Sequence, residues 1–249
     1  MTQGMVKPIT AGRMGNFLFQ AAAAMSYAWD HGMEYTLPDT TNSPVHNPIY
    51  LQHLVRPNFD KTLPQVVVEE QHFCHHERPF KEEWKSGNIL LQGWWQTEKY
   101  FAHYRERILK EFGFLWKPVD GVAVHVRRGD YLRLRNKHPE VPISWILKAM
   151  NLFPGKVFYF FSDDIRWCQK TFGHRSDCIF ASTNNPEADL VMGSCMAHQI
   201  CSASTFSWWI YYLNRNPNKR GIFPRLWYVP GHGGLDVKDI WPSGCEHLD

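Results

Sequence analysis

Stretches with the hydrophobic pattern of strands are followed along the chain by stretches with the pattern of helices, most regularly after residue 121. Short apolar runs predict strands at 122–126, 157–161, 178–180, 199–201 and 220–223. Amphipathic stretches between them predict helices at 144–152, 164–172, 187–197 and 202–213. Strands that alternate with helices of this length are typical of a parallel, doubly wound sheet.

The first half shows the same alternation with longer loops. A weak strand at Met5–Ile9 is followed by a glycine turn, Gly12–Asn16, and by an alanine-rich helix from about Asn16 to His31. Gly32 is placed to cap that helix, because glycine adopts the left-handed conformation that ends many helices. The remaining expectations are short strands at 34–37, 66–69 and 89–91, a loop at 38–65 and a helical stripe at 98–112. This order predicts a Rossmann-like unit.

The two regions meet at Lys117–Gly121, a short stretch with a proline and a glycine. With 249 residues, the chain is long enough for one large domain or two small ones. We therefore expect two halves, residues 1–117 and residues 118–249, each with a parallel sheet.

The composition is that of an ordinary folded protein, with 44% hydrophobic and 20% charged residues. The net charge of +3 is mildly basic and is not gathered into the stripe that nucleic-acid surfaces carry. It therefore fits a small anionic ligand better than nucleic acid. Eleven tryptophans indicate aromatic cores, with sugar- or base-stacking surfaces as the alternative.

No stretch of the sequence has the spacing of a known metal site or the length of a membrane span. The six cysteines form no Cys-x-x-Cys pair, and the histidines around Cys74 (His72, His75 and His76) match no familiar zinc pattern. Residues 17–29 imitate a signal peptide, but Gln20 interrupts them and a strand precedes them. Because no run of about eighteen apolar residues occurs, we expect a cytoplasmic protein, with membrane association at the inner face left open.

One stretch concentrates positive charge at the end of a predicted strand. The apolar strand Val122–Val126 continues into Arg127 and Arg128, followed by Gly129 and Asp130. Ligands of parallel α/β sheets bind beyond the carboxyl ends of the strands, and the guanidinium fork suits phosphate. The pattern predicts an anion site; the alternative is a loop in which the arginines pair with carboxylates.

Other polar groups fall at the same edge of the predicted sheet. His125 lies within the strand end, Asp163 and Asp164 follow the next strand, and Ser204 and Thr205 begin a later helix. With the arginines they can form a site for a nucleotide diphosphate, in which arginines and helix amides hold phosphate. Each group has a structural alternative, because acids and hydroxyls are also the residues that cap helices.

Five motifs, in the same order and over nearly the whole chain, resemble the α-1,2-fucosyltransferases of glycosyltransferase family 11. They are Gly12–Asn16 (GRMGN), Leu91–Phe101 (LQGWWQTEKYF), His125–Tyr131 (HVRRGDY), Phe161–Ile165 (FSDDI) and Ser204–Trp209 (STFSWW). The third and the fifth are specific to the family. The resemblance implies an α/β, GT-B-like fold with two Rossmann-like halves, parallel sheets and a cleft between them.

The same resemblance implies a reaction and its substrates. The expected enzyme is an inverting galactoside 2-α-L-fucosyltransferase that moves L-fucose from GDP-β-L-fucose to the 2-hydroxyl of a galactose-containing acceptor. The acceptor would be an oligosaccharide or a lipid-linked glycan of surface polysaccharide synthesis, such as lipopolysaccharide. Residues 1–117 would form the acceptor side and residues 118–249 the donor side. Neither a cofactor nor a metal ion is implied, which agrees with the lack of an Asp-x-Asp motif in the sequence.

The resemblance also implies the residues of the site. Arg127 would contact the donor diphosphate. The other donor-binding positions implied are His125 and Asp163 near guanine or ribose, Ser204 and Thr205 near phosphate, and Asn16 on the first half's side of the cleft. We add Arg128, beside Arg127, as a donor-binding position, with a structural role as its alternative.

Catalysis by inversion requires charge stabilisation on the leaving diphosphate, which is usually the largest catalytic contribution. We assign that role to Arg127, assisted by Arg128 and by the helix start at Ser204 and Thr205. Asp130 is the acid nearest to the arginines and is the candidate general base. The alternative is a structural role in which Asp130 orients an arginine.

Two residues depart from the family pattern. Phe17 stands where the family usually has glutamine, and Ala203 stands where it usually has asparagine. Both changes remove polar groups near the expected site. Two other functions therefore stay open: a fucosyltransferase with a changed linkage or acceptor, and a catalytically weakened homologue that binds GDP or glycan.

Overall fold

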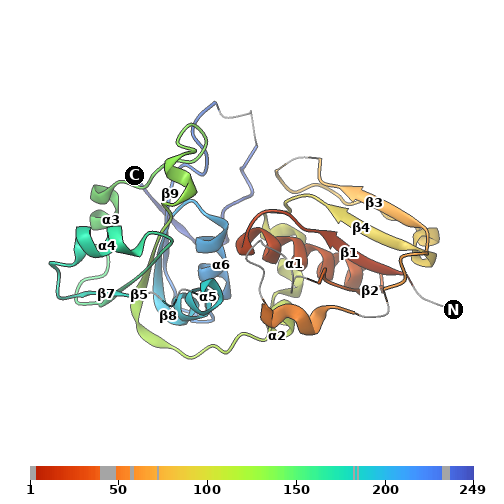
Figure 1. Cartoon of the computed structure of the whole chain (residues 1–249), viewed down its shortest axis with the longest axis horizontal. Coiled ribbons are helices and arrows are strands. Elements are labelled where there is room, and N and C mark those ends of the chain that lie inside the picture. Colours follow the sequence, from red (N-terminus) through yellow and green to blue (C-terminus); the bar gives the residue numbers. More distant parts are fainter. Residues whose placement is uncertain are drawn as a thin grey trace. The chain divides into compact units, whose positions relative to one another are not determined.

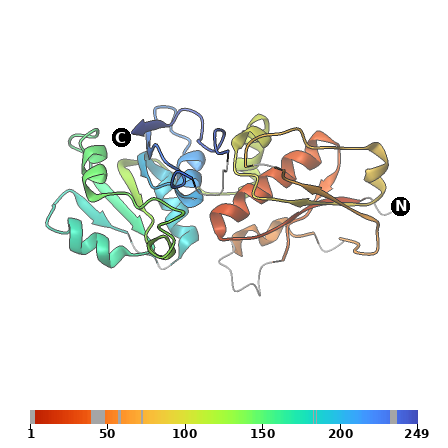
Figure 2. The same cartoon turned by 90° about the horizontal axis from the view of Figure 1, so that it is seen from above.

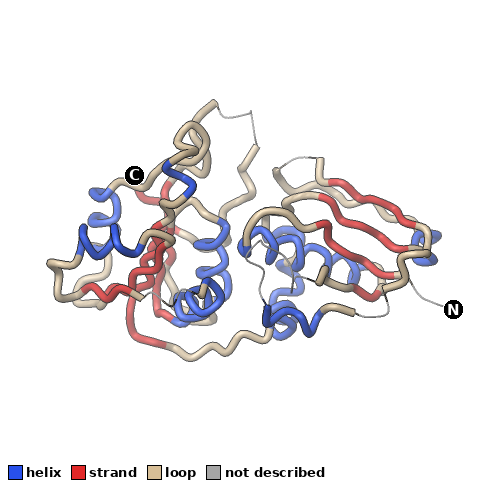
Figure 3. The backbone as a smooth tube through the Cα atoms, viewed as in Figure 1, coloured by secondary structure: helices blue, strands red, loops and turns tan. Residues whose placement is uncertain are grey.

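In the computed structural model, all strand pairs among the described residues run parallel. The structure describes residues 4–39, 49–56, 59–71, 73–181, 183, 185–231 and 236–249. The chain folds into two units, one of Met1–Phe114 with Leu235–Ile240 and one of Leu115–Gly234 with Trp241–Asp249. Figures 1 and 2 colour both units along the sequence, and Figure 3 separates their helices, strands and loops. The acceptor and donor roles of 1–117 and 118–249 stay predictions.

The first unit contains a sheet in the order β2-β1-β4-β3. Its strands are β1 (Met5–Ile9), β2 (Glu34–Tyr35), β3 (Gln65–Glu69) and β4 (Asn88–Gln92). Its α-helices are α1 (Met14–Asp30) and α2 (Arg105–Phe112), and shorter 3₁₀ helices span Ile49–Leu54, Glu82–Ser86, Glu98–Tyr100 and Ala102–Tyr104. The stripe predicted over 98–112 is therefore helical in three short pieces.

Helix α1 packs along this sheet because its residues are small and apolar (Figure 2). The run Ala21–Ala24 is fully buried, and alanine side chains let the helix backbone approach the strands closely. The helix ends as predicted at Gly32, which has φ +63°. The N–H of Met33 donates to the Ala28 carbonyl at 2.8 Å, which completes a Schellman cap.

The second unit contains a sheet in the order β10-β9-β8-β5-β6-β7. Its strands are β5 (Val119–Val126), β6 (Phe158–Ser162), β7 (Cys178–Phe180), β8 (Met196–Cys201), β9 (Gly221–Pro224) and β10 (Glu246–Leu248). Its helices are α3 (Ile143–Met150), α4 (Ile165–Phe172), α5 (Pro186–Cys195) and α6 (Thr205–Leu213), with a 3₁₀ turn at Asp130–Leu132. Helices α3 and α4 lie on one face and α5 and α6 on the other (Figure 1).

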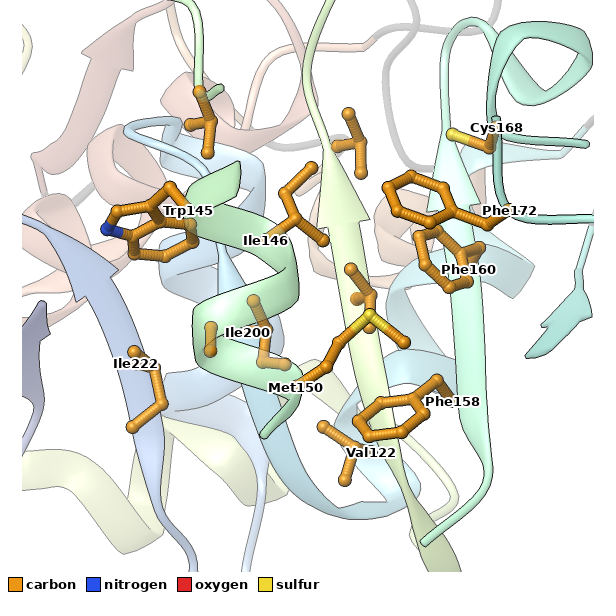
Figure 4. Close-up of a cluster of buried hydrophobic side chains, with 14 of the residues drawn as sticks. Val122, Trp145, Ile146, Met150, Phe158, Phe160, Cys168, Phe172, Ile200 and Ile222 are labelled. Atoms are coloured by element: carbon orange, nitrogen blue, oxygen red, sulfur yellow. The ribbon is translucent and has the colours of Figure 1, made fainter. Parts of the chain in front are cut away.

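The alternation of side chains along β5 separates two environments. Val122 and Val124 face the apolar core beneath α3 and α4, where they meet Met150 and Phe160 (Figure 4). Successive side chains of a strand point to opposite faces, so His125 faces α6 instead. A strand that is buried on both faces is expected in a doubly wound sheet, and it places His125 and the residues after Val126 at the carboxyl edge.

The structure corrects the predicted boundary between α5 and β8. The helix predicted at 187–197 ends at Cys195, and Met196 is already the first residue of β8. Met196 pairs with Val119 and His198 pairs with Val122. Because β5 and β8 pair over this length, both strands begin earlier in the sequence than predicted. Strand β5 begins at Val119, inside Lys117–Gly121. Strand β10, which pairs with β9, was not predicted.

Candidate active site

The carboxyl ends of β5, β6 and β8 bring together the polar groups predicted for the second unit. Ser202, just after β8, donates its hydroxyl to the His125 carbonyl at 2.9 Å and accepts the Arg127 N–H at 3.0 Å. Ser162, at the end of β6, donates its hydroxyl to the Val126 carbonyl at 2.7 Å. These bonds satisfy backbone groups where the strand pairing ends. They also fix the direction in which the loop Arg127–Asp130, here called the arginine loop, leaves the sheet.

Arg127 lies at the centre of this cluster and is held by two acids. Its Nη1 atom lies 2.8 Å from Asp163, and its Nη2 atom lies 2.5 Å from Asp130. The side chain is only 12% exposed. Its Nε atom is buried and has no hydrogen-bond partner among the described residues. A buried donor without a partner is costly and rare in proteins, so this atom favours a site that a ligand acceptor completes.

Arg128 is engaged by groups of its own unit. Its guanidinium stacks on the Trp167 ring at 3.8 Å from the centroid, its Nη1 pairs with Glu140, and its Nε lies 3.4 Å from Asp164. Its backbone N–H donates to Asp163 at 2.9 Å. Four separate interactions hold this residue, as in the alternative in which the arginines pair with carboxylates, and its predicted contact with the donor stays a prediction.

Gly129 is required by the close approach of Asp163 to the loop. A Cβ atom at this position would collide with the Asp163 carboxylate. Because Asp163 binds both Arg127 and the Arg128 N–H, a side chain at Gly129 would disturb both arginines.

His125 is almost fully buried under α6. Its Nδ1 lies 2.6 Å from the Ser207 hydroxyl, and its ring lies 4.8 Å from that of Phe206. Burial, with a smaller contribution from the charge of Arg127, lowers the pKa of His125 to about 3. The ring is therefore neutral at physiological pH, and its direct contact with the donor stays a prediction.

The start of α6 lies beside the same loop. Ser204 caps the helix by accepting the Phe206 N–H at 3.3 Å, and Thr205 is the first helical residue. The cap is one of the alternatives that the sequence left open; contact of Ser204 or Thr205 with phosphate stays a prediction. The dipole of a helix start still favours anions.

Tyr131 belongs to the site but was not singled out from the sequence. Its hydroxyl donates to the Ala203 carbonyl at 3.1 Å, its ring stacks on His138 at 4.0 Å, and the Arg127 guanidinium lies 5.2 Å from its centroid. Burial raises the pKa of Tyr131 well above its usual value. Its place in the HVRRGDY motif was the available signal. The residue ties the arginine loop to the segment before α6.

The first unit holds Asn16 at the start of α1. Its Oδ1 accepts a hydrogen bond from Gln96 Nε2 at 3.0 Å. Gln96 is buried, and its Oε1 atom has no hydrogen-bond partner in the described part of the chain. The Leu91–Phe101 motif therefore reaches the glycine turn through a side-chain amide pair. The predicted role of Asn16 toward the donor is a matter for experiment.

Two further residues that sequence reasoning missed shape the loop after β4. Gln20 accepts the Ala11 N–H at 3.1 Å and donates to the Gly93 carbonyl at 3.0 Å. Glu70 accepts the N–H of Trp94 at 2.6 Å and that of Trp95 at 3.0 Å. A single amide within an apolar helix was the sequence signal for Gln20.

The two departures from the family pattern are both buried. Phe17 is 2% exposed within α1, and Ala203 is 1% exposed before α6. Their effect on activity stays a prediction.

The described part of the chain holds neither a metal cluster among its side chains nor a membrane span among its helices. No group of three or more His, Cys, Asp or Glu side chains in the described part of the chain is placed to hold a metal ion. No helix that the structure describes is long and apolar enough to cross a membrane. His72, one of the histidines near Cys74, lies outside the described residues.

Two α/β units, each with a parallel sheet, belong to the GT-B-like class of folds, as predicted. Within that class, the model of Glycosyl transferase family 11 matches residues 9–220, and the chain belongs to this family. It is therefore a glycosyltransferase, and its family membership confirms the resemblance drawn from the motifs.

Relatives include an α-1,2-colitosyltransferase of Escherichia coli, 27% identical over 88% of this chain and 90% of its own length. Galactoside α-(1,2)-fucosyltransferase 1 of Sus scrofa is 28% identical over 81% of this chain, and the match spans 63% of the pig enzyme. Among solved structures, POFUT1 in complex with GDP-fucose gives a TM-score of 0.52 at 14% identity, covering 89% of this chain and 98% of that one. This last similarity concerns the fold alone.

Proposed function

We propose that the protein transfers L-fucose from GDP-β-L-fucose to the 2-hydroxyl of a galactose-containing glycan, with inversion at the anomeric carbon. Family membership and the names of the relatives support fucose or a fucose-like sugar as the transferred group. The acceptor in this proposal is an oligosaccharide or a lipid-linked glycan of surface polysaccharide synthesis, used in the cytoplasm.

The observation that carries the proposal is the unpartnered Nε of Arg127 at the carboxyl edge of a parallel sheet. Asp130 and Asp163 occupy the two Nη atoms and hold the guanidinium plane in one orientation. In this proposal the groups that cover the Nε–H move when the donor binds, and the Nε–H then donates to an oxygen of the donor diphosphate. A charge-assisted hydrogen bond from arginine to phosphate is short and strong.

In the proposed reaction the acceptor oxygen attacks the anomeric carbon of fucose while the bond from that carbon to the β-phosphate oxygen breaks. The electron pair of the broken bond leaves with GDP, and Arg127 stabilises the charge that develops there. The proton of the acceptor hydroxyl must pass to a base. Asp130 is the nearest acid to Arg127, but its ion pair with that residue favours the bracing role over the role of base.

The transferred sugar has a second candidate. The Escherichia coli relative is named as a colitosyltransferase, and the match covers 90% of that relative's length. Colitose is fucose without the 3-hydroxyl. A site for one sugar therefore differs from a site for the other only in whether it holds that hydroxyl. Initial rates with GDP-fucose and GDP-colitose at equal concentration distinguish the two donors.

Thermal protection tests the nucleotide specificity. GDP or GDP-fucose at about a hundredfold its dissociation constant should stabilise the protein by about 2.7 kcal/mol, whereas UDP-galactose and ADP-glucose should not. Linkage analysis of the product then establishes whether the new bond is α-1,2. Protection by GDP without GDP release from donor plus acceptor would instead identify a weakened, binding-only homologue.

A further inference from the structure

A pocket of about 360 Å³ opens within the first unit at the carboxyl ends of β1, β3 and β4. Ile9 and Glu69 both pair with Gln92, so three neighbouring strands contribute one side chain each at the same level. The preceding residue of β4, Leu91, is fully buried. Because side chains alternate along a strand, Gln92 and its neighbours point to the opposite face and form the pocket floor.

The wall of the pocket is a loop that the fold holds rigidly. Glu70 accepts the N–H groups of both Trp94 and Trp95. Trp95 has φ +55°, the one positive φ of a non-glycine residue in the described part of the chain. Such a conformation costs about 1–3 kcal/mol and persists only where the surroundings enforce it. Here the buried indole of Trp95 and the Glu70 carboxylate enforce it, and Trp94 is left half-buried on the pocket wall.

The chemistry of the lining is divided between apolar and hydrogen-bonding groups. Ile9, Phe73 and Trp94 supply apolar surface, and Ile9 is 40% exposed. Glu69, Gln71 and Gln92 supply acceptors and donors, and Gln92 already donates to Glu69 at 3.2 Å. A pyranose ring has the same division, with C–H groups on its faces and hydroxyls around its edge.

The charge of the lining selects among sugars. Two carboxylates, Glu69 and Glu70, line the pocket, and none of the described residues that line it is basic. Burial raises the pKa of Glu70, but Glu69 is exposed on the sheet. A sugar that carries a carboxylate or a phosphate would meet like charge here. The volume lies at the small end of the range of ligand pockets, which suits a mono- or disaccharide.

We propose that this pocket binds an uncharged pyranose of the acceptor glycan, with Trp94 stacked on the ring and with Glu69 and Gln92 hydrogen-bonded to its hydroxyls. The inference rests on the proposed function for the identity of the acceptor. Residues 1–117 were already expected to form the acceptor side; the inference adds the residues that contact the sugar and the selection of neutral over acidic sugars.

Saturation-transfer NMR with methyl β-D-galactopyranoside tests the pocket directly, without any donor. The wild-type protein should transfer saturation to the ring C–H protons, and Trp94→Ala should abolish the transfer. Ile9→Arg places a long side chain in the pocket from an exposed position. It should also abolish the saturation transfer, although it leaves the half-buried Trp94 ring in place. Trp84→Ala removes a half-buried indole of the same unit outside the pocket and should bind like the wild type.

Kinetics separate this inference from the proposed function. Trp94→Ala and Ile9→Arg should raise the KM for the galactoside about tenfold or more and leave the KM for GDP-fucose unchanged, since tenfold corresponds to about 1.4 kcal/mol. Unchanged galactoside KM and unchanged saturation transfer in both variants would overturn the pocket assignment while transfer activity still supported the proposed function. If the wild type showed no fucosyl transfer but bound the galactoside, and both variants lost saturation transfer, the pocket assignment would stand and the proposed function would be rejected.

Glu69→Gln tests the charge selection. The wild type should bind methyl β-galactoside several-fold more tightly than methyl galacturonoside, and Glu69→Gln should narrow that ratio. Glu83→Gln, an exposed acid of the same unit, should leave the ratio unchanged. An equal affinity of the wild type for both sugars would contradict the selection of uncharged ligands.

Discussion

The Nη1 atom of Arg127 lies 2.8 Å from the carboxylate of Asp163, although the two residues follow different strands. The pairing of Val126 with Ser162 in neighbouring parallel strands brings them together. An acid that pairs with an arginine in this way restricts the rotation of the guanidinium. The pair therefore supplies a guanidinium in a fixed orientation, which is what electrostatic preorganisation requires.

Replacement of Arg127 tests its role at the diphosphate. Arg127→Ala should lower kcat/KM for GDP-fucose by about a hundredfold or more, because the variant lacks the charge that faces the leaving group. Arg127→Lys should recover only part of the rate, since an ammonium lacks the Nε–H and the planar fork. Steady-state kinetics with varied GDP-fucose measure both.

Arg133→Ala is the matched control for this change, because Arg133 is exposed and follows the same loop. It should keep wild-type kinetics. Wild-type turnover in Arg127→Ala would contradict the assigned role.

Replacement of Asp130 distinguishes a brace from a base. General base catalysis contributes roughly a hundredfold to ten-thousandfold. If Asp130 only orients Arg127, Asp130→Asn should lower kcat by less than about tenfold and should keep the acid limb of the pH–rate profile. A thousandfold loss of kcat together with loss of that limb would identify Asp130 as the base.

The buried His125 predicts a dependence of stability on pH. Its pKa is about 3 in the folded protein and about 6.5 when unfolded, so the unfolded state binds the proton first as the pH falls. Its contribution is complete above about pH 6.5 and is lost progressively between pH 6.5 and pH 3. At pH 5 the loss should be about 2 kcal/mol of unfolding free energy.

Urea denaturation of the wild type and of His125→Asn at pH 7 and pH 5 measures this loss. The asparagine variant should show a smaller decrease between the two pH values, because it does not titrate. His174→Asn, at an exposed position, should retain the wild-type decrease. Equal decreases in all three proteins would show that another group is responsible.

Restoring the family's usual glutamine at Phe17 should be costly in this chain. Phe17 is buried in α1, so Phe17→Gln would bury an amide and remove apolar contact. We expect a decrease of about 3 kcal/mol in unfolding free energy, with no gain in turnover. Phe17→Leu should lose much less. A Phe17→Gln variant of unchanged stability and higher activity would show that the site requires the amide.

The strand-end cluster was predictable because alternation of strands and helices implies a parallel sheet, and a parallel sheet gathers its carboxyl ends at one edge. The proximity of Arg127 and Asp163 followed from that rule alone. The distribution of their bonds did not, because the choice among Asp130, Asp163 and Asp164 depends on loop geometry that no periodicity encodes.

The first unit shows where such reasoning stops. The positive φ of Trp95 and the two hydrogen bonds that Glu70 accepts depend on backbone dihedral angles, and aromatic residues give no signal for a left-handed conformation. The start of β8 at Met196 was missed for a related reason: pairing with β5 overrode a local helical pattern.

The segment Leu235–Ile240 belongs to the first unit, although it lies near the end of the sequence, and this affects when that unit can be completed during synthesis. Asp239 accepts the His75 N–H at 3.1 Å and pairs with Lys99. These contacts cannot form until residue 239 has left the ribosome, by which time most of the second unit has already emerged. The unit translated first therefore cannot be completed until most of the other unit has been synthesised, and a fragment that stops at Phe114 would lack part of its own structure.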